Sequence, residues 1–220
     1  MRENISLDNK MNDVPNCENV KKYFGKALSV HGSTAQGADW NSTQSQETRF
    51  AQLIKVIIER SDFTVLDYGC GYGAMAEYLL AQGYEFKQFF GCDILEPMID
   101  EANRLHPDRT RFFFTTEFKQ IPIVDYAVAS GVFNARLQTS YDDWTKYVLN
   151  SLNSINEITK KGFSVNFLTS YSDAEKMQER LYYADPCFLF DYCKKHFSKN
   201  IALYHDYGLY DFTLIVRKNV

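Results

Sequence analysis

The sequence of 220 residues has no apolar run long enough to cross a bilayer, and its N-terminus lacks the apolar core of a signal peptide. Its five cysteines are scattered without a Cys-x-x-Cys pair, so they indicate neither a disulfide framework nor a zinc site. Histidines and carboxylates do not cluster at the spacing of metal ligands. These absences predict a protein of the reducing cytoplasm that holds no metal and does not enter a membrane.

Positive charge is also sparse. The chain has 24 Lys and Arg residues against 28 Asp and Glu residues, a net charge of −4, and no basic stripe suited to a phosphate backbone. We therefore expect no nucleic acid partner. The length suits one domain of ordinary size, and the aromatic fraction of 15% favours an aromatic-lined pocket in addition to a core.

The most informative stretch combines a strand, a tight turn and a helix. A run of β-branched and apolar residues from Phe63 to Leu66 ends at an acid, and alternating glycines then lead into a helix-forming run; the acid and the glycines are Asp67, Gly69, Gly71 and Gly73. Glycine allows a positive φ and lets a ligand approach the backbone closely. The turn is therefore predicted to hold a ligand.

The acid indicates what kind of ligand this is. A dinucleotide fingerprint, G-x-G-x-x-G, places a pyrophosphate at the helix N-terminus. Here the spacing is G-x-G-x-G, and Asp67 stands two residues before the first glycine. A carboxylate at that position repels a pyrophosphate and attracts an ammonium group, so a zwitterionic ligand that carries a sulfonium fits better.

This stretch resembles motif I of the class I S-adenosylmethionine-dependent methyltransferases, D/E-x-G-x-G-x-G, at every position. A second feature agrees with the resemblance, because the apolar run 89–94 contains Asp93, 24 positions after Gly69. In a doubly wound sheet an acid at the end of the second strand can accept hydrogen bonds from both ribose hydroxyls. Asp93 can at the same time be the N-cap of a helix that begins near Glu96.

The resemblance implies an α/β fold with a Rossmann-like sheet of seven strands, mostly parallel, an antiparallel strand 7 and helices on both faces. The runs 201–208 and 210–217 are joined too tightly to be parallel, which favours this fold over that of a nicotinamide-linked oxidoreductase. We expect residues 1–44 to form an arm, a helix and a loop over the cofactor. Residues 45–220 are expected to form the methyltransferase domain.

Hydrophobic periodicity predicts helices over 18–30, 45–60, 96–105 and 141–161, the last of them capped by Gly162. Residues 171–197 follow the fifth predicted strand and are interpreted as a helical lid insertion of two segments. The capping box Ser172-x-x-Glu175 opens the first segment and Pro186 opens the second.

The resemblance also implies which residues bind S-adenosylmethionine. Arg49 is a candidate for the methionine carboxylate and Trp40 for stacking, although a solvated helix face and a core anchor are the alternative roles. By analogy, the residues after the third strand border the adenine. The predicted cofactor-binding residues are Trp40, Arg49, Asp67, Gly69, Gly71, Gly73, Asp93, Ile94, Glu117, Phe118 and Ser130.

Methyl transfer from a sulfonium is an in-line displacement that needs alignment and a dry approach rather than a metal. A hydroxyl acceptor additionally needs a base, for which His205, Asp206 and Asp185 are the candidates; the alternative role for His205 and Asp206 is to cap a turn. The absence of an Asn/Asp-Pro-Pro-Tyr/Phe motif argues against methyl transfer to nucleic-acid bases.

Together these features predict a methyltransferase that modifies a small polar metabolite at an oxygen or a nitrogen atom. The alternative hypothesis is a methyltransferase-like protein that binds S-adenosylmethionine or a partner without catalysis. Neither hypothesis fixes the oligomeric state, so an oligomer is left open.

Overall fold

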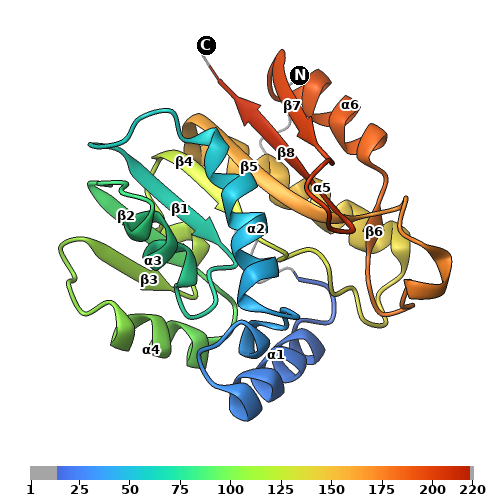
Figure 1. Ribbon diagram of the computed structural model, residues 1–220, viewed down its shortest axis with the longest axis horizontal. Helices are drawn as coiled ribbons and strands as arrows, with labels where there is room; N and C mark the ends of the chain where they lie inside the picture. Colours follow the sequence, from blue (N-terminus) through green and yellow to red (C-terminus); the bar gives the residue numbers. More distant parts are fainter. Residues whose placement is uncertain (1–13, 219–220) are drawn as a thin grey trace.

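A mixed β-sheet forms the centre of the computed structural model, which describes residues 14–218 (Figure 1). The strand order is β3-β2-β1-β4-β5-β8-β7. Strands β1 to β5 pair in parallel, whereas β8 pairs antiparallel with both β5 and β7. The strand bounds are β1 Thr64–Tyr68, β2 Gln88–Cys92, β3 Phe112–Thr115, β4 Val124–Ala129, β5 Thr159–Thr169, β7 Asn200–Tyr204 and β8 Asp211–Arg217.

This arrangement confirms the predicted α/β fold, including the antiparallel last strand inserted between two others. One detail differs, because the short strand β6 (Tyr183–Ala184) pairs in parallel with the end of β5. The sheet therefore has eight strands instead of the seven predicted from the resemblance.

Helices cover both faces of the sheet. Apolar residues of α2, α3 and α4 share one buried cluster, and those of α5 and α6 share the cluster on the other face. Helix α1 lies at the edge of the sheet toward which β1 points (Figure 1). The helix bounds are α1 Cys17–His31, α2 Thr43–Leu53, α3 Ala74–Ala81, α4 Glu96–Leu105, α5 Tyr141–Ile158 and α6 Pro186–His196; the short 3-10 helices are η1 Gln36–Ala38, η2 Ile54–Val56, η3 Phe118–Gln120 and η4 Ala174–Lys176.

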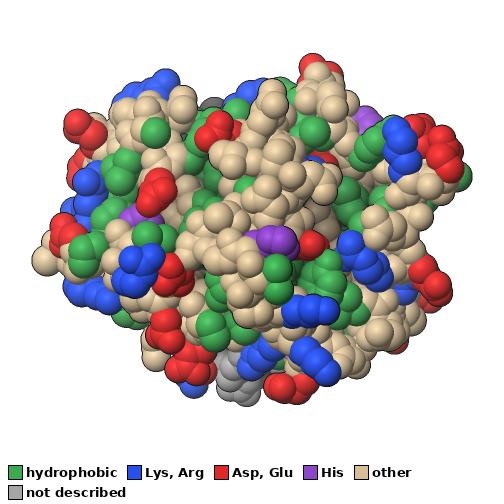
Figure 2. Space-filling view, turned by 60° about the horizontal axis from the view of Figure 1, so that its bottom comes forward, with side chains coloured by type: hydrophobic (Ala, Val, Ile, Leu, Met, Phe, Trp, Pro, Cys, Tyr) green, Lys and Arg blue, Asp and Glu red, His purple; other side chains and the backbone are tan. Residues whose placement is uncertain are grey.

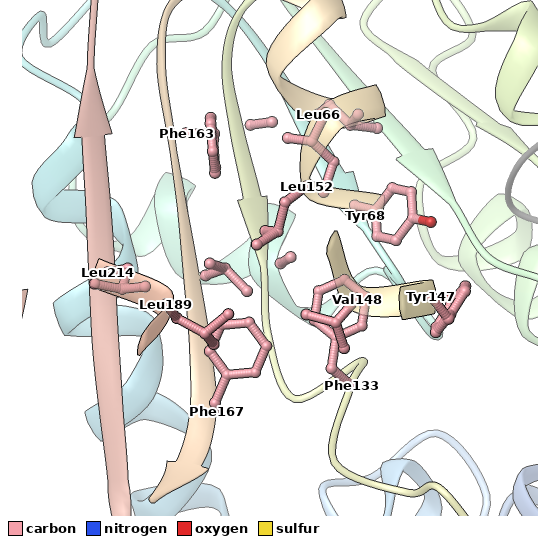
Figure 3. Close-up of a cluster of buried hydrophobic side chains, with 14 of the residues drawn as sticks. Leu66, Tyr68, Phe133, Tyr147, Val148, Leu152, Phe163, Phe167, Leu189 and Leu214 are labelled. Carbon is pink, nitrogen blue, oxygen red and sulfur yellow. The ribbon is translucent and has the colours of Figure 1, made fainter. Parts of the chain in front are cut away.

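The strands contribute side chains to both clusters because successive residues of a strand point to opposite faces. Leu66 and Tyr68 of β1 belong to the cluster beneath α5, while Val65 belongs to the cluster beneath α2 and α3. Figure 3 shows the first cluster, in which side chains of β1, β5 and β8 meet those of α5 and α6. The rings of Phe133 and Phe167 stack there with their centroids 5.5 Å apart.

Two predicted helices are too long. Helix α2 ends at Leu53 and continues only as the 3-10 helix η2, whereas the prediction extended to Arg60. Helix α5 ends at Ile158, so Gly162 lies inside β5 and does not cap a helix. A Cβ at position 162 would come within 2.3 Å of the carbonyl oxygen of Val216. Glycine is present there because the backbone of β8 passes close to it.

The first helical segment of the predicted lid is also wrong. The Ser172 hydroxyl donates to the carbonyl of Thr169 (2.7 Å) instead of capping a helix, and only the 3-10 helix η4 follows. The backbone farther on is extended and pairs with the loop after β4, since the amide of Tyr182 donates to the carbonyl of Asn134 (2.8 Å). The second segment, α6, begins at Pro186 as predicted.

Candidate functional site

The glycine turn after β1 has the backbone conformation that its sequence predicts. Gly69, Gly71 and Gly73 have φ values of 80°, 52° and 88°. The amides of Gly69 and Cys70 both donate to the carbonyl of Cys92 at the end of β2 (2.8 and 3.1 Å). A Cβ on Gly69 would also lie 2.6 Å from Cγ2 of Val132, so both the positive φ and the close approach require glycine there.

Asp93 joins the turn to the second strand. Its Oδ2 accepts a hydrogen bond from the amide of Gly71 and its Oδ1 accepts one from the amide of Leu95, both at 2.9 Å. Burial raises the pKa of Asp93, against the lowering effect of these amides. The N-cap position of α4 is Leu95, so Asp93 does not cap that helix. The two features that the sequence presents separately thus form one hydrogen-bonded unit.

Asp67 is the least satisfied polar side chain of this unit. It lies within β1, paired with Gly91 of β2 and Val128 of β4, and is 3% exposed. Its Oδ1 is buried and has no hydrogen-bond partner among the described residues. Burial, and secondarily the charge of Asp93, raises the pKa of Asp67 to about 8. A positively charged ligand group that donates a hydrogen bond would satisfy Oδ1 and stabilise the ionised carboxylate.

Asp67 and Asp93 border one cavity, which opens beyond the carboxyl ends of β1, β2 and β4. Open α/β sheets commonly bind ligands at this edge. The predicted residues that line the cavity are Trp40, Asp67, Gly69, Gly71, Asp93, Ile94 and Ser130. The Oγ of Ser130 is buried without a hydrogen-bond partner among the described residues, as is Oδ1 of Asp67.

Trp40 forms a wall of this cavity. The guanidinium of Arg49 lies over its ring at 4.5 Å from the centroid. On another side, a Cβ at Gly131 would lie 2.3 Å from Cη2 of Trp40, so the indole packs directly against the Gly131 backbone. Gly131 has a φ of 66° and also borders the cavity.

The structure places four predicted cofactor residues away from the cavity lining. Arg49 forms a bidentate ion pair with Asp211, so its guanidinium is not available to a ligand carboxylate in this structure. Gly73 is the N-cap residue of α3 and packs against His106. The remaining two are Glu117, which pairs with Lys119 (3.4 Å), and Phe118, whose buried ring meets Tyr68 edge to face.

None of the three candidate bases borders the cavity. His205 and Asp206 are exposed in the turn between β7 and β8, where the ring of His205 lies 6.0 Å from that of Tyr171. Asp185 is exposed and caps α6, because its Oδ1 accepts hydrogen bonds from the amides of Cys187 (2.8 Å) and Phe188 (3.2 Å). The structure therefore does not bring these side chains to the glycine turn.

The cavity has further walls that carry no functional signal in the sequence. Val20, Lys21 and Phe24 of α1 cover it, and Trp144 and Tyr147 of α5 line another side. Periodicity identifies these helices as amphipathic, but an apolar face over a cavity has the same pattern as one over a core. Leu181, from the segment before β6, completes this part of the lining.

The described residues form neither a metal centre nor a bilayer-spanning helix. Among residues 14–218, no group of three or more His, Cys, Asp or Glu side chains is arranged to hold a metal ion. Within the same part of the chain, no helix has both the length and the apolar character needed to span a bilayer.

Comparisons with known proteins agree with this geometry. The profile of a family described as "Methyltransferase domain" matches residues 66–160. A protein of Mycobacterium tuberculosis named "Putative methyltransferase Rv1506c" is 43% identical over 165 residues, which are 75% of this chain and 99% of that relative.

Solved structures share the fold at low sequence identity. The N-methyltransferase NodS from Bradyrhizobium japonicum, in complex with S-adenosylhomocysteine, has a TM-score of 0.62 at 13% identity and covers 92% of this chain and 100% of its own. The complex of DhpI with S-adenosylhomocysteine has a TM-score of 0.61 at 13% identity, covering 93% of this chain and 98% of its own. These structures show the shared fold, and the 43% identical relative, the family profile and the motif at Asp67 show that the chain belongs to the class I S-adenosylmethionine-dependent methyltransferase family.

Proposed function

We propose that this methyltransferase binds S-adenosylmethionine in the cavity between Asp67 and Asp93 and methylates a small polar metabolite at an oxygen or a nitrogen atom. One observation carries the cofactor assignment. Oδ1 of Asp67 is buried at the cavity wall without a partner among the described residues, and a ligand ammonium group would supply the missing donor.

The residues present fit the cofactor. When bound, its sulfonium supplies an electrophilic methyl group. Asp67 would hold the ammonium group, and Asp93, already fixed by the amides of Gly71 and Leu95, would accept hydrogen bonds from the ribose hydroxyls. Trp40 and Val132 would exclude water from the bound ligand, since both line the cavity.

A small acceptor is proposed because the cavity has walls on several sides. Helix α1 contributes Val20 and Phe24, the loop before α2 contributes Trp40, and the segment before β6 contributes Leu181. Lys21 and Asn134 add polar groups to this lining, which supports an acceptor with a polar substituent. On the face seen in Figure 2, acidic and basic side chains are interspersed, in keeping with a proposal that does not involve a polyanion.

We propose further that residues 171–185, the part of the predicted lid 171–197 that precedes α6, serve as a lid over this site. Its Arg180 donates to the hydroxyl of Tyr23 in α1 (2.7 Å), and that hydroxyl donates to Asp39 in the loop before α2 (2.8 Å). The segment around Arg180 is thus tied to two neighbouring N-terminal segments beside the cavity, which Asp39 lines. Arg180 is therefore the link between this segment and the residues that cover the cavity from α1 and the loop after it.

Isothermal titration of the full chain with S-adenosylmethionine and S-adenosylhomocysteine tests the cofactor assignment. We expect both to bind, and Asp67→Asn to weaken binding about tenfold or more, because a charge-assisted hydrogen bond contributes about 1.5–3 kcal/mol. Asp125→Asn is the matched control, since Asp125 bonds Thr64 (2.9 and 3.0 Å) at the opposite end of β1 and does not line the cavity. Failure of the wild-type chain to bind either compound would refute the proposal.

The acceptor class is tested by incubating the chain with S-adenosylmethionine that carries a labelled methyl group. Pools of small amines, hydroxy acids and phosphorylated metabolites serve as acceptors, and oligonucleotides are included as a separate arm. Label in a small metabolite is the expected result. Label only in the oligonucleotide arm would overturn the small-acceptor proposal and leave the cofactor assignment intact.

A further inference from the structure

A buried ion pair lies close behind the cavity. Arg49 of α2 donates from Nε to Oδ1 of Asp211 (3.0 Å) and from Nη2 to its Oδ2 (2.6 Å), and its Nη1 donates to the carbonyl of Ser45 (2.8 Å). Arg49 is 7% exposed and Asp211 is 1% exposed. A buried ion pair is weak evidence for stability, because desolvation offsets much of the attraction. The ion pair also contacts two other side chains, those of Asn166 and Trp40.

Asn166 extends the pair toward the cavity. This fully buried residue of β5 donates from Nδ2 to Oδ1 of Asp211 (2.9 Å) and accepts at Oδ1 from the amide of Gly131 (2.8 Å). Gly131 lines the cavity, whereas Asn166 and Asp211 do not. The Asn166 side chain thus links the Asp211 carboxylate through two hydrogen bonds to the backbone just after β4.

The chain of contacts returns to its starting point through Trp40. The Arg49 guanidinium lies over the indole at 4.5 Å, and the indole packs against Gly131, where a Cβ would come within 2.3 Å of Cη2. These contacts therefore form a closed ring of five residues: Gly131, Asn166, Asp211, Arg49 and Trp40. Two members of this ring, Gly131 and Trp40, line the cavity. The other three are buried polar residues that do not line it.

We propose that Arg49, Asp211 and Asn166 are positioning residues of the binding site, which fix the Trp40 indole and the Gly131 backbone against the bound cofactor without touching it. This inference rests on the proposed function, because it takes the cavity to be the cofactor site. In this role Arg49 supports the wall of the site and does not bind the methionine carboxylate of the cofactor. A lysine at position 49 would keep the charge but lose both the planar stacking on Trp40 and the bidentate geometry.

The experiment measures the affinity of the full chain for S-adenosylhomocysteine in Asn166→Leu and Arg49→Lys, at temperatures where each variant is folded. The control is Ser164→Ala, which removes another buried hydrogen bond of β5, from Ser164 to the carbonyl of Leu53 (2.7 Å), away from the cavity. Acrylamide quenching reports on Trp40, because the chain's other tryptophan, Trp144, is 1% exposed. Trp40→Phe identifies the quenched signal.

We expect Asn166→Leu and Arg49→Lys to raise the dissociation constant about tenfold and to make Trp40 easier to quench. Ser164→Ala should lower the melting temperature while leaving affinity and quenching unchanged. If the wild type binds and both variants bind equally well, the positioning role is overturned and the proposed function stands. If the wild type does not bind, the proposed function fails and this inference fails with it. If Asn166→Leu does not fold, the affinity and quenching of Arg49→Lys alone test the positioning role.

Discussion

Asp67 is a buried carboxyl group that the described residues around it do not satisfy. It is buried in the middle of a sheet, and no described group donates to its Oδ1. Burial raises its pKa from 3.8 to about 8, so near neutral pH the Asp67 side chain is a neutral acid. An ammonium group would favour the ionised form, and cofactor binding should therefore release a proton.

The first prediction concerns stability against pH. Because the folded pKa of Asp67 is about 8 and an unfolded Asp titrates near 3.9, the folded state binds more protons between these values. The stability that Asp67 contributes is full below about pH 4 and is lost as the pH rises through about 8. Urea unfolding of the ligand-free chain at pH 5 and pH 8 should show a loss of stability on the order of a few kcal/mol, and Asp67→Asn should make this loss clearly smaller. An unchanged pH dependence in Asp67→Asn would contradict the prediction.

Sequence patterns identify those site residues whose neighbours in space are also close to them in the sequence. Asp67 and the glycines lie in one short stretch, and Asp93 follows at a spacing set by a single βαβ unit, so Asp67 and Asp93 lie together at the cavity. Arg49 could not be placed in this way. Its partner Asp211 is 162 positions away on a strand whose neighbours depend on the complete sheet order.

At the scale of elements, the glycine turn depends on its residues in different ways. Gly69 has a positive φ and faces Val132. Gly71 also has a positive φ, but the nearest atom to a Cβ at this position would be Sδ of Met98, at an ordinary contact distance of 3.9 Å. Position 69 is thus restricted by both conformation and packing. Position 71 is restricted by conformation and borders the open cavity.

The second prediction compares alanine at these two positions. Gly69→Ala should destabilise the protein by about 2–5 kcal/mol, since backbone strain and a clash add together. Gly71→Ala should destabilise it by only about 1–2 kcal/mol but weaken binding of S-adenosylhomocysteine, because its methyl group enters the cavity. Chemical denaturation and calorimetric titration measure the two effects. Equal destabilisation by both substitutions would argue against the packing described for Gly69.

The third prediction concerns the start of α6. Asp185→Ala removes two hydrogen bonds to the amides of Cys187 and Phe188 and should destabilise the protein by about 1 kcal/mol. It should leave both cofactor affinity and methyl transfer unchanged, because Asp185 does not line the cavity. A large loss of transfer with normal affinity would restore Asp185 as a candidate base.

Element boundaries were less predictable than element types. Pro186 opens α6 as expected, since a proline at the first helical turn has a local effect. The capping box at Ser172 fails because its serine bonds to Thr169 and the following backbone pairs with a distant loop. Local propensity is overridden there by pairing that the sequence pattern does not contain.

At the scale of the whole molecule, the site joins parts of the chain that are far apart. Its walls come from helices α1 to α5, the loop before α2, the ends of three strands and the segment before β6. A ligand in this cavity contacts elements from both faces of the sheet, so binding should stabilise the fold as a unit.

The fourth prediction follows from this linkage. S-adenosylhomocysteine at about 100 times its dissociation constant should add about 2.7 kcal/mol of stability, which for a chain of this size raises the melting temperature by about 5–10 °C. Differential scanning calorimetry measures the shift, and Asp67→Asn at the same ligand concentration should show a smaller one. No shift in the wild type would mean that the compound does not bind the folded state.

The contact between Trp40 and Gly131 limits how this chain can diverge. The indole occupies the space that any side chain at position 131 would need. Homologous proteins with a larger residue at position 131 should therefore carry a smaller one at position 40, and the two sites should change together during evolution.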